Sequence, residues 1–83
     1  MKLKQLGSNM TEITTDNSNV LFSYETPVAG WDIEGAFKTD EFFSVTTSRH
    51  INKYFAGVNP EKIRIVKQGY IKDMMLENVG GGI

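Results

Sequence analysis

A chain of 83 residues, 40% of them hydrophobic and 23% charged, has the length and composition of one small globular domain. It has no cysteine, which excludes disulfide frameworks, thiolate zinc sites and cysteine nucleophiles, and its single histidine leaves little for a transition metal. The formal charge of -1 provides no overall positive field that would favour nucleic acid or an anionic membrane. Residues 1–7 lack the apolar core of a signal peptide, and no apolar run approaches the roughly 18 residues of a membrane span. We therefore expect a cytoplasmic protein without a membrane partner.

The first predicted unit is a β-hairpin. Residues 10–15 alternate apolar with polar side chains and are rich in β-branched residues, which is typical of a half-buried strand. The polar residues 16–19 predict a chain reversal, and residues 20–25 predict the returning strand. Alternation along that strand places the better core candidates on one face: Val20, Phe22 and Tyr24.

The next stretch has weaker patterns. Pro27 has no amide hydrogen, which limits how far the preceding strand can stay central in a sheet. Glycines flank residues 31–34, so we expect a loop or an irregular strand end there. Residues 36–39 predict a strand, Asp40 and Glu41 offer a turn, and residues 42–46 have the composition of a short strand.

The clearest local signal is a helix. The hydroxyl residues 46–48 predict its N-cap, residues 49–56 its body and Gly57 its end. At 100° per residue the packing face combines Ile51, Tyr54 and Phe55. The opposite face carries Arg49 and Lys53, with His50 at the border.

The C-terminal third predicts a strand and a second helix. Asn59 and Pro60 separate the first helix from residues 62–67, whose alternation predicts a strand with Ile63 and Ile65 facing the same way. Residues 69–79 predict a helix whose inward side chains are Ile71, Met74 and Met75. The last four residues, 80–83, are expected to form a flexible tail.

Together these elements predict a single α+β domain over residues 1–83. We expect a mostly antiparallel sheet of three to five strands, packed on one side by two short helices.

The start of the first helix is a candidate anion site. Backbone amides, hydroxyl donors and a guanidinium group suit a phosphate there. The candidate residues are Thr46, Thr47, Ser48, Arg49, His50 and Lys53. Helix capping explains the hydroxyl groups equally well, and a solvated helix face explains the cations.

The sequence offers no convincing catalytic set. His50 is the only imidazole that could serve a serine or threonine nucleophile, and its spacing from those residues proves nothing. No nucleophile elbow, phosphate loop or dinucleotide fingerprint is present. We therefore predict a protein that is not an enzyme and assign no catalytic residue, metal site or cofactor.

Three aromatic residues in predicted loops or at a strand start are candidates for an interface: Trp31, Phe42 and Phe43. They are more large apolar groups than so small a core can easily absorb, and aromatic residues are common interface anchors. The alternative is that they cap an open end of the core.

Two stretches carry a family resemblance. Residues 21–29 read LFSYETPVA, and residues 44–54 read SVTTSRHINKY. This pair resembles a family of small proteins of unknown function, recurrent in tailed-phage genomes, with LFSYxTPVA followed by SxTTSRHINKW. The resemblance covers about residues 5–76, and Tyr54 stands where relatives often have tryptophan. It implies a phage-encoded accessory protein of the infected bacterial cytoplasm and carries over no activity.

Two functions from different classes remain. The leading hypothesis is a small non-enzymatic interaction protein that modulates a host protein. The alternative is nucleotide or nucleic-acid binding through Thr46–Arg49 and nearby basic residues. Edge strands of a short sheet could also pair two copies of the chain in a homo-oligomer.

Overall fold

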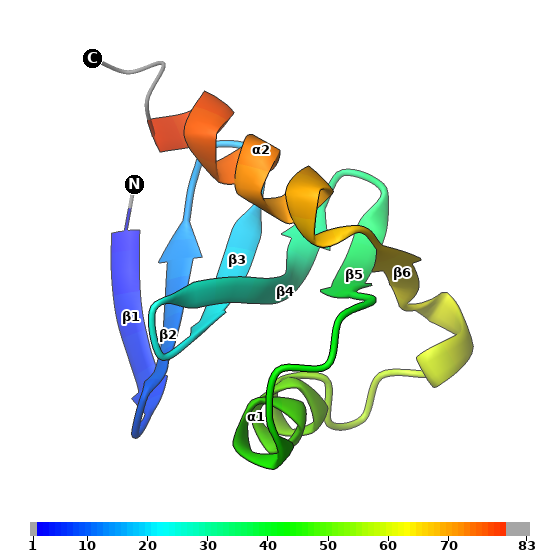
Figure 1. Ribbon diagram of the computed structural model, residues 1–83. Coiled ribbons are helices and arrows are strands. Elements are labelled where there is room, and N and C mark those ends of the chain that lie inside the picture. Colours follow the sequence, from blue (N-terminus) through cyan, green and yellow to red (C-terminus); the bar gives the residue numbers. More distant parts are fainter. Residues whose placement is uncertain (1, 80–83) are drawn as a thin grey trace.

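The computed structural model describes residues 2–79, and the predicted tail at 80–83 lies outside these residues. The described chain forms one six-stranded sheet and two α-helices (Figure 1). In chain order the elements are β1 (Lys2–Gly7), β2 (Met10–Thr14), β3 (Asn19–Ser23), β4 (Thr26–Asp32), β5 (Gly35–Thr39), α1 (Val45–Tyr54), the 3-10 turn η1 (Pro60–Lys62), β6 (Arg64–Val66) and α2 (Gln68–Val79). The α+β class and the mostly antiparallel sheet are confirmed.

Spatial order in the sheet follows chain order. The first five strands are neighbours joined by tight turns, and each pair is antiparallel. Only β6 runs parallel to its neighbour β5, because the chain passes through α1 between them. The sheet therefore has six strands rather than the predicted three to five, and the two additions are β1 and β4.

The two helices cover opposite faces of the sheet, not one face as predicted. Neighbouring residues of β3 point to opposite sides, and Leu21 and Val20 belong to separate buried clusters. Side chains of α1 pack on the Leu21 side, and Ile71 of α2 packs on the Val20 side. The expectation that one face of this strand would be the better core was wrong, because both faces are covered.

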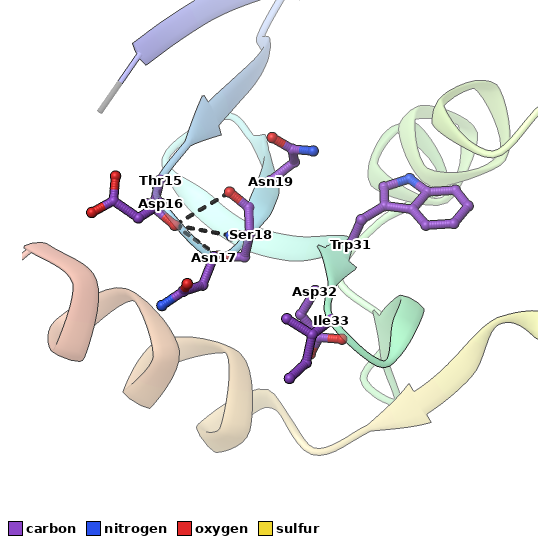
Figure 2. A pocket seen from close by; sticks show the side chains of 8 residues that line it. All are labelled: Thr15, Asp16, Asn17, Ser18, Asn19, Trp31, Asp32 and Ile33. Atoms are coloured by element: carbon purple, nitrogen blue, oxygen red, sulfur yellow. Dashed lines mark hydrogen bonds between the residues drawn. The ribbon is translucent and has the colours of Figure 1, made fainter.

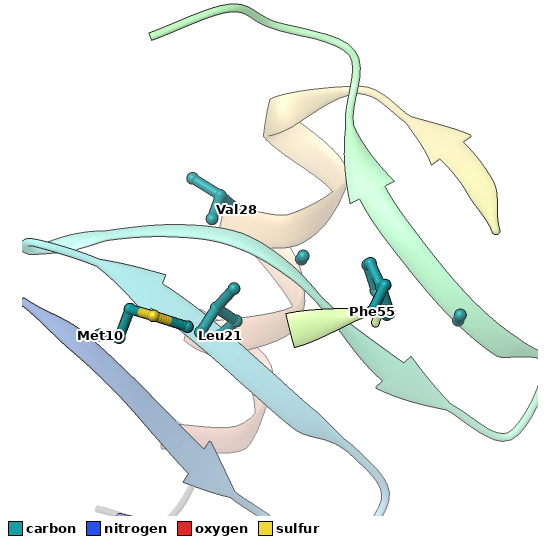
Figure 3. Close-up of a cluster of buried hydrophobic side chains, with 6 residues drawn as sticks. Met10, Leu21, Val28 and Phe55 are labelled. Carbon is teal, nitrogen blue, oxygen red and sulfur yellow. The ribbon is translucent and has the colours of Figure 1, made fainter. Parts of the chain in front are cut away.

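The core on the α1 side is the larger of the two clusters. Figure 3 shows Met10 and Leu21 next to each other on β2 and β3, together with Val28 of β4 and Phe55, which follows α1. Its buried members are Met10, Leu21, Val28, Ala29, Ala36 and Phe55. The cluster on the α2 side is built on Val20, Phe37 and Ile71, with Met74 and Met75 packed against it. The inward face predicted for the second helix is confirmed.

Strand β4 is central, although Pro27 and the glycines predicted otherwise. The pairing skips Val28, because Leu21 opposes Ala29 whereas Phe22 opposes Pro27, so a β-bulge accommodates the proline. A Cβ on Gly30 would lie 2.1 Å from the carbonyl oxygen of Asn19. Gly30 therefore allows a close approach of β3 and β4 and does not mark a loop.

Helix α1 begins earlier than predicted. Ser44 is its N-cap, and the side chain of Ser44 accepts a hydrogen bond from the amide of Thr47. Residues 42–44 precede the helix without forming a strand, so the short strand predicted at 42–46 is wrong. The helix also ends earlier than predicted, at Tyr54 with Phe55 as C-cap, and Gly57 in the following turn has a positive φ of 86°.

The last strand is shorter than predicted and lies at the edge of the sheet. Ile63 precedes β6 and packs against the α1-side core, whereas Ile65 is 66% exposed. Of the strand predicted at 62–67, only Arg64–Val66 pairs in the sheet, and β6 has β5 as its one neighbour there.

Candidate functional site

A cluster of hydroxyl groups and an imidazole joins α1 to the sheet. The Ser23 hydroxyl at the end of β3 lies 2.8 Å from Nδ1 of His50 and 3.0 Å from Oγ1 of Thr47. The N-cap Ser44 donates its hydroxyl to Thr47 Oγ1 over 3.2 Å. Ser23 and Thr47 are buried, so these bonds satisfy polar groups that water cannot reach. We name Ser23, Ser44, Thr47 and His50 the hydroxyl cluster.

Ser23 and His50 are as close as a nucleophile and its general base, but the Ser23 hydroxyl is not accessible to a substrate. The Ser23 side chain is only 2% exposed, and its hydroxyl is shared between the imidazole and Thr47. A nucleophile must reach the substrate, which this burial prevents. The geometry therefore supports a structural role for the hydroxyl cluster.

The six anion-binding candidates are divided between the interior and the surface. Thr47 and His50 belong to the hydroxyl cluster, whereas Thr46, Arg49 and Lys53 are exposed. The amide of Ser48 donates to the carbonyl of Ser44 over 3.0 Å. The structure thus brings the six residues onto one helix but directs their side chains to different places.

The three interface candidates lie near different ends of α1. The Trp31 ring packs edge-on against Phe55 at a centroid distance of 5.9 Å, just past the last residue of the helix. Phe42 and Phe43 precede its first residue, and the exposed Val45 follows them. Trp31 is 38% exposed and Phe42 73%, so Phe42 offers the larger free surface.

A groove that the sequence did not reveal lies beside Phe42. It separates α1 from the end of β5 and has a volume of about 180 Å³. It is lined by Lys38, Thr39, Asp40, Glu41, Phe42, Ser48, Ile51 and Asn52. The exposed Ile65 of β6 is the strand neighbour of Lys38, so a second apolar side chain lies near this groove.

Ion pairs and a hydrogen bond connect β6 and α2 to the end of β4 and the turn that follows it. Arg64 pairs with Asp32 and, over 3.1 Å, with Glu34, and the Tyr70 hydroxyl donates to Asp32 over 3.1 Å. Burial acts to raise the pKa of Asp32, but the hydrogen bonds from Arg64 and the Glu34 amide outweigh it and hold that pKa below its usual value. No local sequence pattern connects these residues.

A second hollow, of about 330 Å³, lies between the turn at 15–19 and the end of β4 (Figure 2). Thr15 and Ser18 bond to each other within that turn, and Asp32 is already held by Arg64. Figure 2 shows the indole of Trp31 turned toward α1 and away from Asp16. Among the described side chains, those of residues 2–75, no three histidine or acidic groups gather in a way that could hold a metal ion.

In the described part of the chain, neither helix combines the length and apolar character needed to cross a bilayer. The fold and the sites define a small α+β protein with a sheet between two helices, a hydroxyl cluster that joins the sheet to α1, and a groove beside the exposed Phe42. The chain belongs to a family of unknown function, DUF8033, whose model matches residues 1–73. No curated protein and no solved structure matches the chain significantly.

Proposed function

We propose that this chain is a small non-enzymatic interaction protein. We further propose that it is a phage-encoded accessory protein, which acts in the bacterial cytoplasm and modulates a host protein. The resemblance of residues 21–29 and 44–54 to a family recurrent in tailed phages supports this setting. The exposed aromatic surface beside α1 supports the mode of action.

The observation that carries the proposal is the exposure of Phe42 at the mouth of the groove. A phenylalanine that is 73% exposed leaves most of its apolar surface in water, which association with a partner would bury. Phe43 and Val45 extend this apolar surface, and the groove offers room for one large side chain of the partner. An aromatic anchor beside a pocket is a common centre of binding energy in protein interfaces.

The test compares gently purified wild-type protein with Phe42→Ala in native mass spectra of bacterial lysate fractions. Ile33→Ala is the matched control, because Ile33 is 91% exposed but lies in the turn between β4 and β5, away from the groove. We expect one co-purified polypeptide that is retained by wild type and Ile33→Ala and lost by Phe42→Ala. A polypeptide retained equally by all three, or only a bare monomer or homo-oligomer, would count against this surface.

Nucleotide or nucleic-acid binding is the second candidate. Arg49 and Lys53 are exposed one turn apart on α1, and neither forms an ion pair with a side chain of residues 2–75. This function requires salt-dependent binding of an oligonucleotide that weakens in Arg49→Ala. A titration without salt dependence argues against it.

A further inference from the structure

A third hollow, unrelated to the groove beside Phe42, opens where two hairpin ends meet. It has a volume of about 630 Å³, within the range of small-molecule sites. We name it the hairpin hollow. Its lining residues are Gln5, Asn9, Thr11, Tyr24, Glu25 and Thr26. Gln5, Asn9 and Thr11 belong to the β1–β2 hairpin, and residues 24–26 form the turn after β3 and the first residue of β4.

Two residues of the hairpin hollow have left-handed backbone conformations. Asn9 has a φ of 59° and Tyr24 a φ of 58°, and the Tyr24 amide donates to the Asn9 carbonyl over 2.8 Å. Asparagine tolerates this conformation, but tyrosine adopts it at a cost of about 1 kcal/mol or more. Glycine would adopt this conformation without the steric cost, so a turn by itself does not explain the tyrosine at position 24.

The Tyr24 ring packs against another ring and keeps an exposed surface. It contacts the His50 ring at a centroid distance of 5.9 Å and is still 51% exposed. His50 is in turn fixed by its bond to Ser23. The hydroxyl cluster thus positions an exposed aromatic surface at the hollow. Helix α1 separates this surface from the groove, which lies against Ser48, Ile51 and Asn52.

The other side chains of the hollow are polar and available. Among the six, only Gln5 makes a side-chain hydrogen bond to the part of the chain with described side chains, residues 2–75, and its partner is the Gly7 carbonyl at 3.3 Å. Asn9 provides amide donors and an acceptor, Thr11 and Thr26 provide hydroxyl groups, and Glu25 provides a carboxylate acceptor. No lysine or arginine lines the hollow, so it lacks the partner that a phosphate or carboxylate would need.

We propose that the hairpin hollow binds a neutral polyhydroxylated ligand, such as a sugar ring, stacked on Tyr24. The apolar face of a sugar ring covers an aromatic surface, and its hydroxyl groups both donate and accept hydrogen bonds with amide, hydroxyl and carboxylate side chains. Glu25 repels anions, which separates this ligand class from nucleotides.

The test is a titration of the isotope-labelled protein, followed by amide NMR shifts, with glucose, N-acetylglucosamine, maltotriose and AMP as probes. We expect at least one of the sugars to shift amides of residues 5–11 and 24–26, and AMP to leave them unchanged. No shift with any of the three sugars would overturn the proposal, as would an AMP shift of equal size at the same residues.

Two variants test the contacts. Tyr24→Asn removes the ring but tolerates the left-handed conformation, and Thr11→Val removes a hydroxyl group while keeping the shape and strand preference of the side chain. We expect sugar binding to weaken about tenfold in Tyr24→Asn and severalfold in Thr11→Val. Phe42→Ala is the control and should bind sugar like wild type. Amide spectra that remain native outside the hollow show that the variants fold, and unchanged sugar affinity in both would contradict the assignment.

Discussion

The hydroxyl of Ser23 and Nδ1 of His50, 27 residues apart in the chain, lie 2.8 Å apart and connect strand β3 to helix α1. The same hydroxyl contacts Thr47 one turn earlier on the helix. Two helical side chains therefore depend on one buried serine, which fixes the position of α1 on the sheet.

We predict that Ser23→Ala destabilises the protein by about 1–3 kcal/mol, because it removes the partner of a buried threonine hydroxyl and of an imidazole. In a domain of this size that corresponds to a loss of about 4–8 °C in Tm per kcal/mol. Thr46→Ala, at an exposed position of the same helix, is the control and should stay within about 0.5 kcal/mol of wild type. Denaturant unfolding measures both, and equal stabilities would show that the hydroxyl cluster contributes nothing.

Tyr54 gives a prediction for alkaline pH. Its hydroxyl donates to Glu12 over 2.5 Å, and burial followed by this hydrogen bond raises the pKa of Tyr54 well above its usual value of 10.0. The folded state then holds the phenol proton at pH values where the unfolded state releases it, so stability falls as the pH rises above about 10.

Tyr54→Phe should therefore cost about 1 kcal/mol at neutral pH and lose less stability than wild type above pH 10. Unfolding free energies from urea titrations at neutral and alkaline pH measure this difference. Parallel pH profiles for the two proteins would rule out the proposed role of the phenol, whatever the other tyrosines and lysines contribute.

Asp32 predicts the opposite pH dependence of stability, because its contribution is lost at acidic pH. Its pKa is lower in the folded state, so its contribution is present above the usual value of 3.8 and is lost as the pH falls through the folded value. We expect Asp32→Asn to destabilise the protein at pH 7 by about 1 kcal/mol and to match wild type more closely near pH 2. Thermal unfolding across this range measures the gap, and a gap that widens on acidification would contradict the assignment.

Two glycines provide a matched pair for backbone packing. At Gly30 an added Cβ would also meet the Phe37 ring at 2.9 Å, whereas at Gly69 in α2 nothing lies within 4 Å. Gly30→Ala should cost about 3 kcal/mol or more, and Gly69→Ala should stabilise the helix by about 0.5 kcal/mol. Circular dichroism melting curves should therefore move in opposite directions.

The parts of the fold that could be predicted are those that local patterns specify. The β2–β3 hairpin follows from alternation on both sides of a polar turn, and α2 follows from its apolar spacing. Strand β1 is an exposed edge, so it lacks a buried alternating face. Strand β4 depends on a bulge at Val28 and on the approach of β3 to Gly30, neither of which is encoded by neighbouring residues.

In the candidate sites, too, local sequence patterns specify some features and leave others unspecified. Four hydroxyl residues occur near the start of α1, and all could be caps by composition. The bond from distant Ser23 explains why Thr47 turns into the interior, and Ser44 caps the helix. The pairing of Arg64 with Asp32 and the hairpin hollow around Tyr24 likewise arise only when segments distant in the sequence come together.

The order of strands in the sheet has a consequence for how the chain folds during synthesis. Strands β1 to β5 pair with their sequence neighbours, so this meander closes through short loops and can form early. The parallel docking of β6 must wait for α1, and the Val20 face stays open until α2 arrives. A nascent chain halted before residue 68 would thus carry an uncovered apolar sheet face, the kind of intermediate that aggregates or recruits chaperones.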